Sequence, residues 1–239
     1  MPRIKIASEG ICNFCGETFS KAAITRHIAA CRAKRMPQKA AGKTQKTFWL
    51  LAEGREKPEY WLHFEISAST TLIMLDQFLR DVWLECCGHL SAFTIDKTRY
   101  ELDTGGIDSM WGGFFGPATP SKSMKARLDK VLKPGMKFEH EYDFGSTTEL
   151  TLKVIAEHEV PGQKKDLYIF SRNNPPNIPC AKCGKPAAQV CVECIYDGAQ
   201  AWLCNAHTKN HKCGADMFLP VVNSPRVGTC GYTGDAELF

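Results

Sequence analysis

The short spacing between cysteines and histidines is the feature of this sequence that most constrains how it can fold. Four close pairs fall within residues 180–213: Cys180 and Cys183, Cys191 and Cys194, Cys204 and His207, and His211 and Cys213. Thiolates and imidazoles at such spacing are typical ligands of tetrahedral zinc, and eight of them suit two ions. Because four complete pairs leave no coordination position open, the sequence predicts structural zinc rather than catalytic zinc.

The pairing of these ligands is a separate question. Successive pairs often interleave, so that the first shares an ion with the third and the second with the fourth, as in B-box and related cross-brace modules. This pattern predicts one ion at Cys180, Cys183, Cys204 and His207, and another at Cys191, Cys194, His211 and Cys213. Sequential pairing remains open, and so does Cys230 in place of Cys213, because a single residue separates His211 from Cys213.

A further set of ligands lies near the N-terminus. Its members are Cys12, Cys15, His27 and Cys31. The last two are four residues apart and therefore share one face of a helix. Phe19 and Ile24 stand where small ββα fingers place their apolar pair, so residues 10–32 resemble a zinc finger of the C2HC type. The sequence thus predicts about three structural zinc ions in all.

Several classes of protein are excluded by what the sequence lacks. No apolar run approaches the ~20 residues that a membrane-spanning helix needs. Residues 1–5 lead directly into a polar cysteine motif and do not form the apolar core of a secretion signal. We therefore expect a cytoplasmic protein in a reducing compartment, where close cysteine spacing indicates metal more often than disulfides.

Positive charge is concentrated in the first fifth of the chain. Residues 1–46 hold ten Lys and Arg against Glu9 and Glu17, a net charge of +8, so the remaining residues carry −4 of the total of +4. Such a segment is suited to a polyanion, and its cations would contact phosphates without reading base sequence. The expected nucleic-acid-binding residues are Lys21, Arg26, Arg32, Lys34, Arg35, Lys39, Lys43 and Lys46.

Composition divides the chain into four segments. We expect a C2HC finger at 1–31, a flexible basic linker at 32–46, an α+β domain at 47–172 and a zinc module with its tail at 173–239. In the α+β domain, apolar alternation predicts a half-buried strand at Tyr60–Ile66, and strands near 138–144, 150–154 and 167–170. Helical spacing predicts two main helices, one after Thr70 that reaches Cys87 and one from Pro120 to Leu132.

The expected fold class is therefore α+β: a compact central sheet, mixed or antiparallel, with two main helices, flanked by the ββα finger and the B-box-like module. Strand alternation places Glu139, Glu141 and Asp143 on the solvent face. The adjacent Cys86 and Cys87 end the first helix, where packing explains them more simply than chemistry.

The middle and end of the chain resemble the plasmid pRiA4b ORF-3-like family. The resemblance rests on Tyr60–Ile66, the helix from Thr70 to Cys87, the run at 89–93, Glu141-Tyr142-Asp143-Phe144-Gly145 and the tail from Leu219 to Gly234. It covers roughly residues 47–239, and the N-terminal finger is an addition. It implies a compact α+β fold and an association with plasmids and transposons, but no defined activity.

Nothing in the sequence indicates catalysis or a small-molecule substrate. The histidines of the middle segment lack ligand or triad spacing, and the Gly-rich stretch around Trp111–Phe115 does not have the placement of a phosphate-binding loop. We therefore expect a zinc-binding, non-catalytic accessory protein of a mobile element or plasmid that binds nucleic acid, most readily DNA, through its basic N-terminal arm. The alternative is a zinc-stabilised adaptor between proteins.

Overall fold

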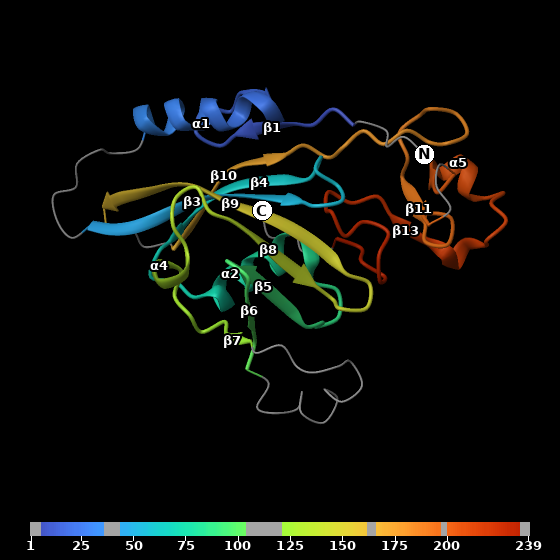
Figure 1. Cartoon of the computed structure of the whole chain (residues 1–239). Coiled ribbons are helices and arrows are strands. Elements are labelled where there is room, and N and C mark those ends of the chain that lie inside the picture. Colours follow the sequence, from blue (N-terminus) through green and yellow to red (C-terminus); the bar gives the residue numbers. More distant parts are fainter. Residues whose placement is uncertain (1–5, 36–43, 104–120, 162–165, 197–199, 235–239) are drawn as a thin grey trace.

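The computed structural model describes residues 6–35, 44–103, 121–161, 166–196 and 200–234. It is a mixed α+β structure with one large sheet and few helices (Figure 1), as the sequence predicts. Among the described residues, no helix is long and apolar enough to cross a membrane.

The N-terminal half contains β1 (Glu9–Cys12), β2 (Thr18–Ser20), α1 (Lys21–Arg35), β3 (Thr44–Gly54), β4 (Trp61–Ser67), α2 (Leu72–Leu79), its continuation η1 (Arg80–Leu84), β5 (Ser91–Ile95) and β6 (Thr98–Glu101). The C-terminal half contains β7 (Lys122–Ser123), α4 (Leu128–Val131), β8 (Lys137–Tyr142), β9 (Thr148–Pro161), β10 (Leu167–Asn173), β11 (Gln189–Cys191), β12 (Trp202–Leu203), α5 (Asn205–Thr208), η2 (Ala215–Met217) and β13 (Phe218–Pro220).

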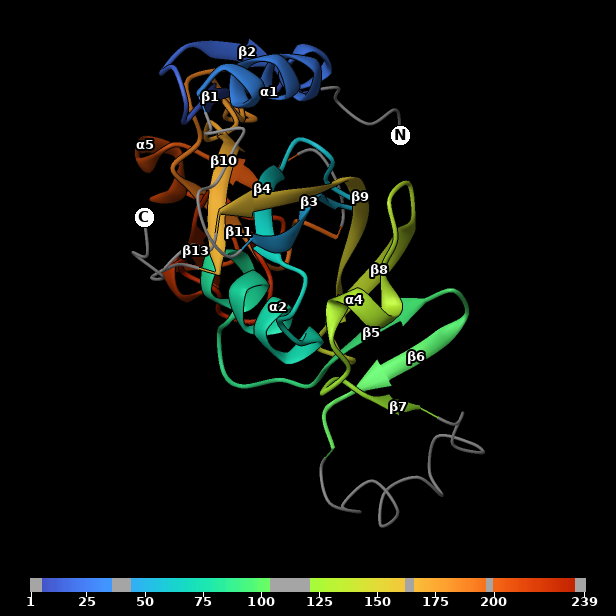
Figure 2. The same ribbon diagram turned by 90° about the vertical axis from the view of Figure 1, so that its left-hand side faces the viewer.

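Ten of the described strands form the large sheet in the order β2-β1-β10-β4-β3-β9-β8-β5-β6-β7. Its pairs are antiparallel except β6 with β7. The long strands β3 and β9 pair from Thr44 to Gly54 and form the middle of the sheet. Figure 2 shows the sheet twisting from α1 at one end to β7 at the other. A separate sheet of β12-β11-β13 belongs to the C-terminal segment.

The helix formed by α2 and η1 covers one face of this sheet. Thr71 caps its start by accepting a hydrogen bond from the backbone N–H of Met74. Its apolar positions, including Leu75 and Trp83, are buried against Phe64 and its neighbours on the sheet. A helix is found where apolar spacing predicts one, but it ends at Leu84, before the expected end at Cys87.

The second expected helix is largely absent. Residues 122–123 form β7, Met124 is buried in a turn, and only Leu128–Val131 is helical. The reason is long-range pairing: the backbone N–H groups of Leu72 and Ile73 bond to the carbonyls of Ala126 and Met124, which are then not available for helical hydrogen bonds. The expected cap at residues 119–120 and the aromatic loop at 111–115 lie outside the described residues.

Strand β4 is buried on both faces, although its sequence predicts a half-buried strand. Trp61, His63 and Glu65 all lie on the face expected to be exposed, yet each is at most 1% exposed. They are covered by α1, whose Ile24 and Ile28 are fully buried over this face. The alternation of β4 therefore separates two buried faces, one under α2 and one under α1.

The N-terminal β-β-α unit is built into the large sheet. β1 pairs with β10 from Gly10 opposite Asn173 to Cys12 opposite Ser171, and β2 pairs with β1. The expected linker at 32–46 is also shorter than its sequence suggests, because α1 continues to Arg35 and β3 begins at Thr44. The remaining residues, 36–43, lie outside the described part of the chain.

The close approach of β1 to β10 yields a prediction about this junction. A Cβ atom at Gly10 would collide with the carbonyl oxygen of Arg172 and would lie 2.6 Å from the ring of Trp61. Gly10→Ala is therefore expected to lower the free energy of unfolding by ~1–3 kcal/mol, measured by urea denaturation. Gly145→Ala is the matched control, since its Cβ would meet its nearest atom, in Asp143, at 3.4 Å. Equal stability of the two variants would contradict the tight β1–β10 junction.

The C-terminal sheet also packs against the central core. Val190, Ala201 and Val227 are fully buried and belong to the same apolar cluster as Leu50 and Leu152 of β3 and β9. Lys57 joins the two parts by donating to the carbonyls of Pro225 and Val227. The C-terminal segment thus shares its apolar core with the central sheet.

Candidate metal centres

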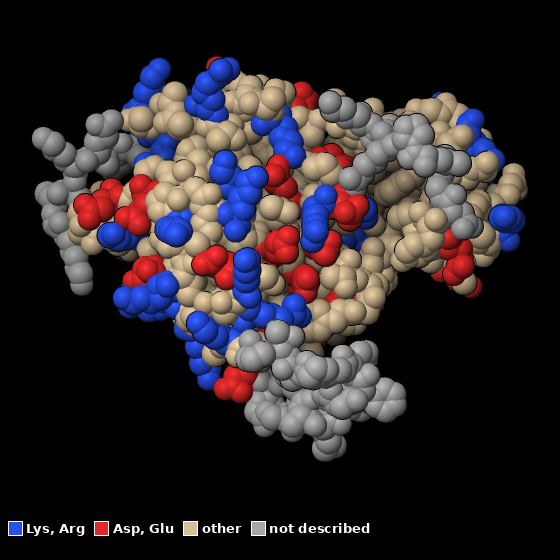
Figure 3. Space-filling model, in the orientation of Figure 1, with Lys and Arg blue, Asp and Glu red and all other residues tan. Residues whose placement is uncertain are grey.

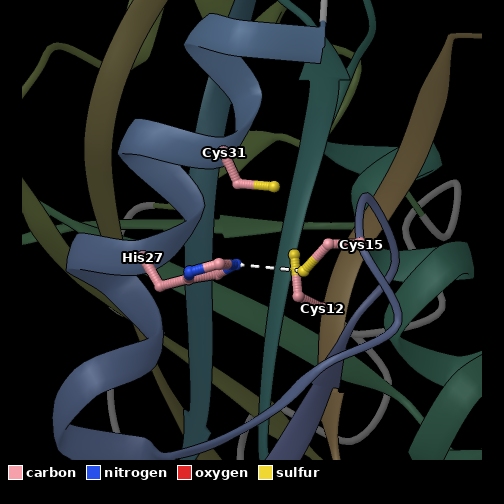
Figure 4. Close-up of side chains that lie close together, drawn as sticks. All are labelled: Cys12, Cys15, His27 and Cys31. Carbon is pink, nitrogen blue, oxygen red and sulfur yellow. Dashed lines mark hydrogen bonds between the residues drawn. The ribbon is translucent and has the colours of Figure 1, made fainter.

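The N-terminal ligand set comes together between the β1–β2 turn and α1. The metal-binding atoms of Cys12, Cys15, His27 and Cys31 all lie within 4.8 Å of one another. His27 and Cys31 point from α1 toward the two cysteines on the turn, as Figure 4 shows, and Cys15 Sγ lies 3.3 Å from His27 Nε2. Phe19 stacks on the imidazole of His27 with ring centroids 3.7 Å apart, which fixes the orientation of the ring.

A common turn presents the first cysteine pair in two of the sets. In the N-terminal set, the backbone N–H of Gly16 bonds to the carbonyl of Cys12. In the C-terminal segment, Gly184 bonds in the same way to Cys180. Both glycines have positive φ, +79° and +72°, which a glycine adopts without strain. The sequence Cys-x2-Cys-Gly thus forms a turn that exposes two sulfurs on one side.

The C-terminal ligands form two sets that interleave along the chain. One contains Cys180, Cys183, Cys204 and His207, and the other contains Cys191, Cys194, His211 and Cys213. In the first, Cys204 Sγ lies 3.3 Å from His207 Nδ1 and 3.9 Å from Cys183 Sγ. In the second, Cys194 Sγ lies 3.4 Å from His211 Nε2 and 3.7 Å from Cys213 Sγ. Neither set contains Cys230.

These separations fit the size of a tetrahedral zinc site. Zinc bonds of about 2.3 Å to sulfur and about 2.0 Å to nitrogen place neighbouring ligand atoms roughly 3.5–3.8 Å apart. The donor set of each cluster, three cysteines and one histidine, is also one that structural zinc commonly uses. The described residues therefore contain clusters that could hold metal ions, and their chemistry is consistent with zinc.

The free thiols differ in how readily they ionise. Burial raises the pKa of Cys12 to about 11. At Cys180 burial acts in the same direction, but backbone N–H groups of Cys204 and Lys182 outweigh it and lower the pKa to about 6. Since zinc binds thiolates, an ion entering the N-terminal set must displace a proton that burial holds firmly.

A further cluster was missed by the sequence reasoning. Cys86, Cys87, His89 and Cys230 bring their metal-binding atoms within 4.8 Å of one another. The interpretation of Cys86 and Cys87 as packing residues is therefore incomplete, and so is the view that His89 has no ligand spacing. The usable signal was the unassigned Cys-Cys-x-His run, but its partner Cys230 is distant along the chain.

Three of the expected nucleic-acid-binding residues are engaged within the protein. Arg32 donates to the buried carboxylate of Glu65 at 2.6 Å and is only 12% exposed. Lys21 pairs with Glu53 at 2.5 Å and donates to the carbonyl of Pro58. Lys46 pairs with Glu157 at 2.8 Å on the surface. The sequence could not foresee these pairs, because their acids lie on other strands of the folded sheet.

The other basic residues of α1 face solvent. Arg26, Lys34 and Arg35 are exposed, and none has an ion-pair partner among the described residues. Lys39 and Lys43 lie outside the described residues. Figure 3 shows Lys and Arg side chains along α1 at the top of the molecule, whereas both signs of charge intermingle over the sheet below.

Docking of α1 on the sheet buries a polar network. Glu65 accepts hydrogen bonds from Arg32 and Thr47 and also contacts His158, and these contacts lower its pKa against the opposing effect of burial. Burial lowers the pKa of His63 to about 3, so this ring is neutral. It accepts from Trp49 Nε1 at Nδ1, and its Nε2 therefore donates to Thr25 Oγ1 at 3.2 Å.

The start of α1 lines a groove of about 900 Å³ against the sheet. Ser20, Lys21, Ala22 and Thr25 border it on one side and Leu51 and His63 on the other. In nucleic-acid-reading fingers the first helical turn contacts base edges. Here that turn faces the rest of the protein, which leaves Arg26 and the end of α1 as the accessible basic part.

Asp143 is buried, contrary to the alternation expected for its strand. β8 ends at Tyr142, and Asp143 turns inward with a positive φ of 66°. Its carboxylate accepts from Arg226 at 2.7 Å and from the hydroxyl of Ser146. Burial opposes ionisation, but these bonds and the backbone N–H groups of Gly145 and Ser146 hold the pKa of Asp143 well below its usual range.

Comparison with known proteins gives little further information. No protein-family model matches the chain, and no curated protein matches it. Among solved structures it is similar to a protein of unknown function from Methanosarcina mazei Go1, with 17% identity over 53% of this chain and 68% of that chain, and a TM-score of 0.41. A likeness at this level carries no argument about function.

Proposed function

We propose that the protein is a zinc-stabilised, non-catalytic accessory protein that binds nucleic acid, with DNA as the expected form, through the exposed basic part of α1 and the residues that follow it. The observation that carries this proposal is the set of Arg26, Lys34 and Arg35, exposed on one helix without ion-pair partners among the described residues. An accessory role in a mobile element or plasmid rests on the family resemblance alone.

Bound metal ions fix the position of the helix that forms the binding surface. Zinc at Cys12, Cys15, His27 and Cys31 forms a C2HC finger whose helix is fixed to the sheet, and two ions in a B-box-like cross-brace hold the C-terminal segment. Each ion has four protein ligands, so its role is structural. The fixed helix presents cations at constant spacing to a phosphate backbone, which lowers the entropy lost on binding.

The contact is expected to be strongly salt-dependent and weakly sequence-dependent. Arg26, Lys34 and Arg35 offer up to three phosphate contacts, and Lys39 and Lys43 add two more. Each phosphate contact contributes about −0.9 to the slope of log K against log salt concentration for duplex DNA. The slope should therefore lie between roughly −3 and −4.5.

Neutralising the three helix cations tests this proposal. We expect Arg26→Gln/Lys34→Gln/Arg35→Gln to weaken duplex binding on the order of 100-fold at ~0.15 M salt and to flatten the slope by about 3. Fluorescence anisotropy with labelled duplex, single-stranded DNA and RNA across a salt series gives both quantities. The matched control is Lys125→Gln/Lys130→Gln/Lys133→Gln, which removes three exposed cations elsewhere.

Equal losses in the two triple variants would mean that net charge, rather than α1, governs binding. An absence of binding in all three forms of nucleic acid would favour the second candidate function, an adaptor between proteins. That candidate is supported by Leu90 and Phe144, which are 46% and 45% exposed. Their backbone segments lie side by side, because the N–H of Asp143, the residue before Phe144, bonds to the carbonyl of Leu90.

A further inference from the structure

The cluster of Cys86, Cys87, His89 and Cys230 has the dimensions of a metal site. His89 Nε2 lies 2.9 Å from Cys87 Sγ and 3.2 Å from Cys230 Sγ. The sulfur of Cys87 lies 3.9 Å from that of Cys230 and 3.4 Å from that of Cys86. These separations run from 2.9 to 3.9 Å, compared with 3.3–3.9 Å in the three sets described above. The two sulfur–sulfur distances are too long for a disulfide bond of about 2.05 Å.

The cysteine inventory of the chain supports the same interpretation. The twelve cysteines divide without remainder into four sets of three, and each set includes one histidine. Three of these sets match the ligands expected from their spacing. The fourth has the same composition, although its ligands come from two segments far apart in the sequence.

Hydrogen bonds from neighbouring residues hold the ligands of this cluster in place. Tyr142 Oη accepts from the backbone N–H groups of Cys86 and His89, which fixes the loop between them. The fully buried Arg226 donates to Cys86 Sγ at 3.4 Å, and Asp143 in turn holds Arg226 at 2.7 Å. A cation next to a sulfur stabilises the thiolate, and three thiolates around one divalent ion leave a net negative charge that Arg226 can balance.

We propose that Cys86, Cys87, His89 and Cys230 bind a fourth zinc ion, which joins the C-terminal tail to the end of the α2–η1 helix. Zn²⁺ replaces the protons of the thiols, which pass to solvent, and no oxidant or reductant is involved. The bound ion closes a loop between His89 and Cys230, two residues 141 positions apart. Such long-range closure restricts the unfolded chain more than any of the local sets does.

This fourth site is also the most accessible of the four sets. Two of its cysteines, Cys87 and Cys230, are exposed, whereas each of the other sets has at most one exposed ligand. We therefore expect its zinc to leave first when a chelator is added.

Counting metal ions tests the proposal. Native mass spectrometry of the full chain, purified without chelator and supplied with zinc, is expected to show four ions per chain, and His89→Ala or Cys230→Ser should show three. His158→Ala is the control, because this histidine belongs to none of the four sets, and it should retain four. Three ions in the unaltered chain and in His89→Ala alike would overturn the proposal.

Thiol alkylation provides a readout that needs no variant. In the zinc-loaded chain Cys86, Cys87 and Cys230 should react slowly with iodoacetamide, and a limiting amount of chelator should expose these three before the other nine, as located by peptide mass. Rapid alkylation of Cys230 in the zinc-loaded protein would contradict the site. A mass about 2 Da lower, with Cys87 joined to Cys230, would show a disulfide instead and equally overturn it.

Discussion

Cys191→Ser is expected to unfold the C-terminal segment, from about residue 178 to residue 220, and to release the zinc held there. Cys191 is fully buried at the end of β11, within the set that includes Cys194 and His211. The sheet around it consists of strands of two and three residues, which are too short to be stable alone. Structural zinc typically contributes on the order of 10 kcal/mol of apparent binding free energy, more than the whole stability of many domains.

The measurement is hydrogen exchange with the zinc content determined in parallel. In Cys191→Ser, amides of β11, β12 and β13 should exchange as in an unfolded chain, while those of β3 and β9 stay protected by their packing against α2 and the neighbouring strands. Val192→Ser is the matched control, because it introduces the same side chain next to the ligand without removing one. Full protection of β11 in the zinc-depleted variant would show that apolar packing alone folds this segment.

Arg226→Met is expected to lower the free energy of unfolding by about 3–5 kcal/mol, because it leaves the buried carboxylate of Asp143 without its countercharge. Arg226 is fully buried and also donates to the carbonyl of Ser146 and the hydroxyl of Thr148. The measurement is urea denaturation at neutral pH. Arg55→Met is the control: its guanidinium is 46% exposed and pairs with Glu149 on the surface, so its loss should cost under about 1 kcal/mol.

The effect of Arg226→Met should depend on pH with a defined sign. The folded-state pKa of Asp143 is lowered, so its interactions stabilise the fold above the ordinary pKa of about 3.8, and this stabilisation is lost as the pH falls below it. Without Arg226 the carboxyl group protonates more readily. The difference in stability between the two proteins should therefore stay constant from neutral pH to about pH 4 and narrow as the pH falls further. A difference that widens toward acid would contradict the assigned pair.

Local spacing was sufficient to group the ligands that lie close together in the sequence. His27 and Cys31 share a helix face, and Cys12 and Cys15 share a turn, so short-range geometry determines where their side chains meet. The same reasoning failed for Cys230, because its partners lie within the central domain, and His89 is 141 positions earlier in the sequence. Only the path of the tail, held by Ser224 bonding to the carbonyl of Trp83, brings them together.

The sequence predicts the wrong burial for the polar side chains of β4, because α1 forms a second layer over that face of the sheet. The alternation in β4 distinguishes apolar from polar side chains, and it predicts that Glu65 lies on a solvent-exposed face. The sequence could not show that α1 lies over that face and that Arg32 compensates the buried carboxylate. Asp143 was misplaced for a different reason: alternation ends with the strand at Tyr142, and the left-handed backbone of the next residue reverses its direction.

The central claim is that metal ions bound by three cysteines and one histidine hold the N-terminal β-β-α unit and the C-terminal segment against the central sheet. X-ray absorption spectroscopy at the zinc edge tests this claim most directly. Every cluster has this composition, so the average zinc ion should have three sulfur neighbours at about 2.3 Å and one nitrogen neighbour at about 2.0 Å. Protein purified without chelator that contains no zinc, or zinc surrounded mainly by oxygen and nitrogen, would contradict the claim.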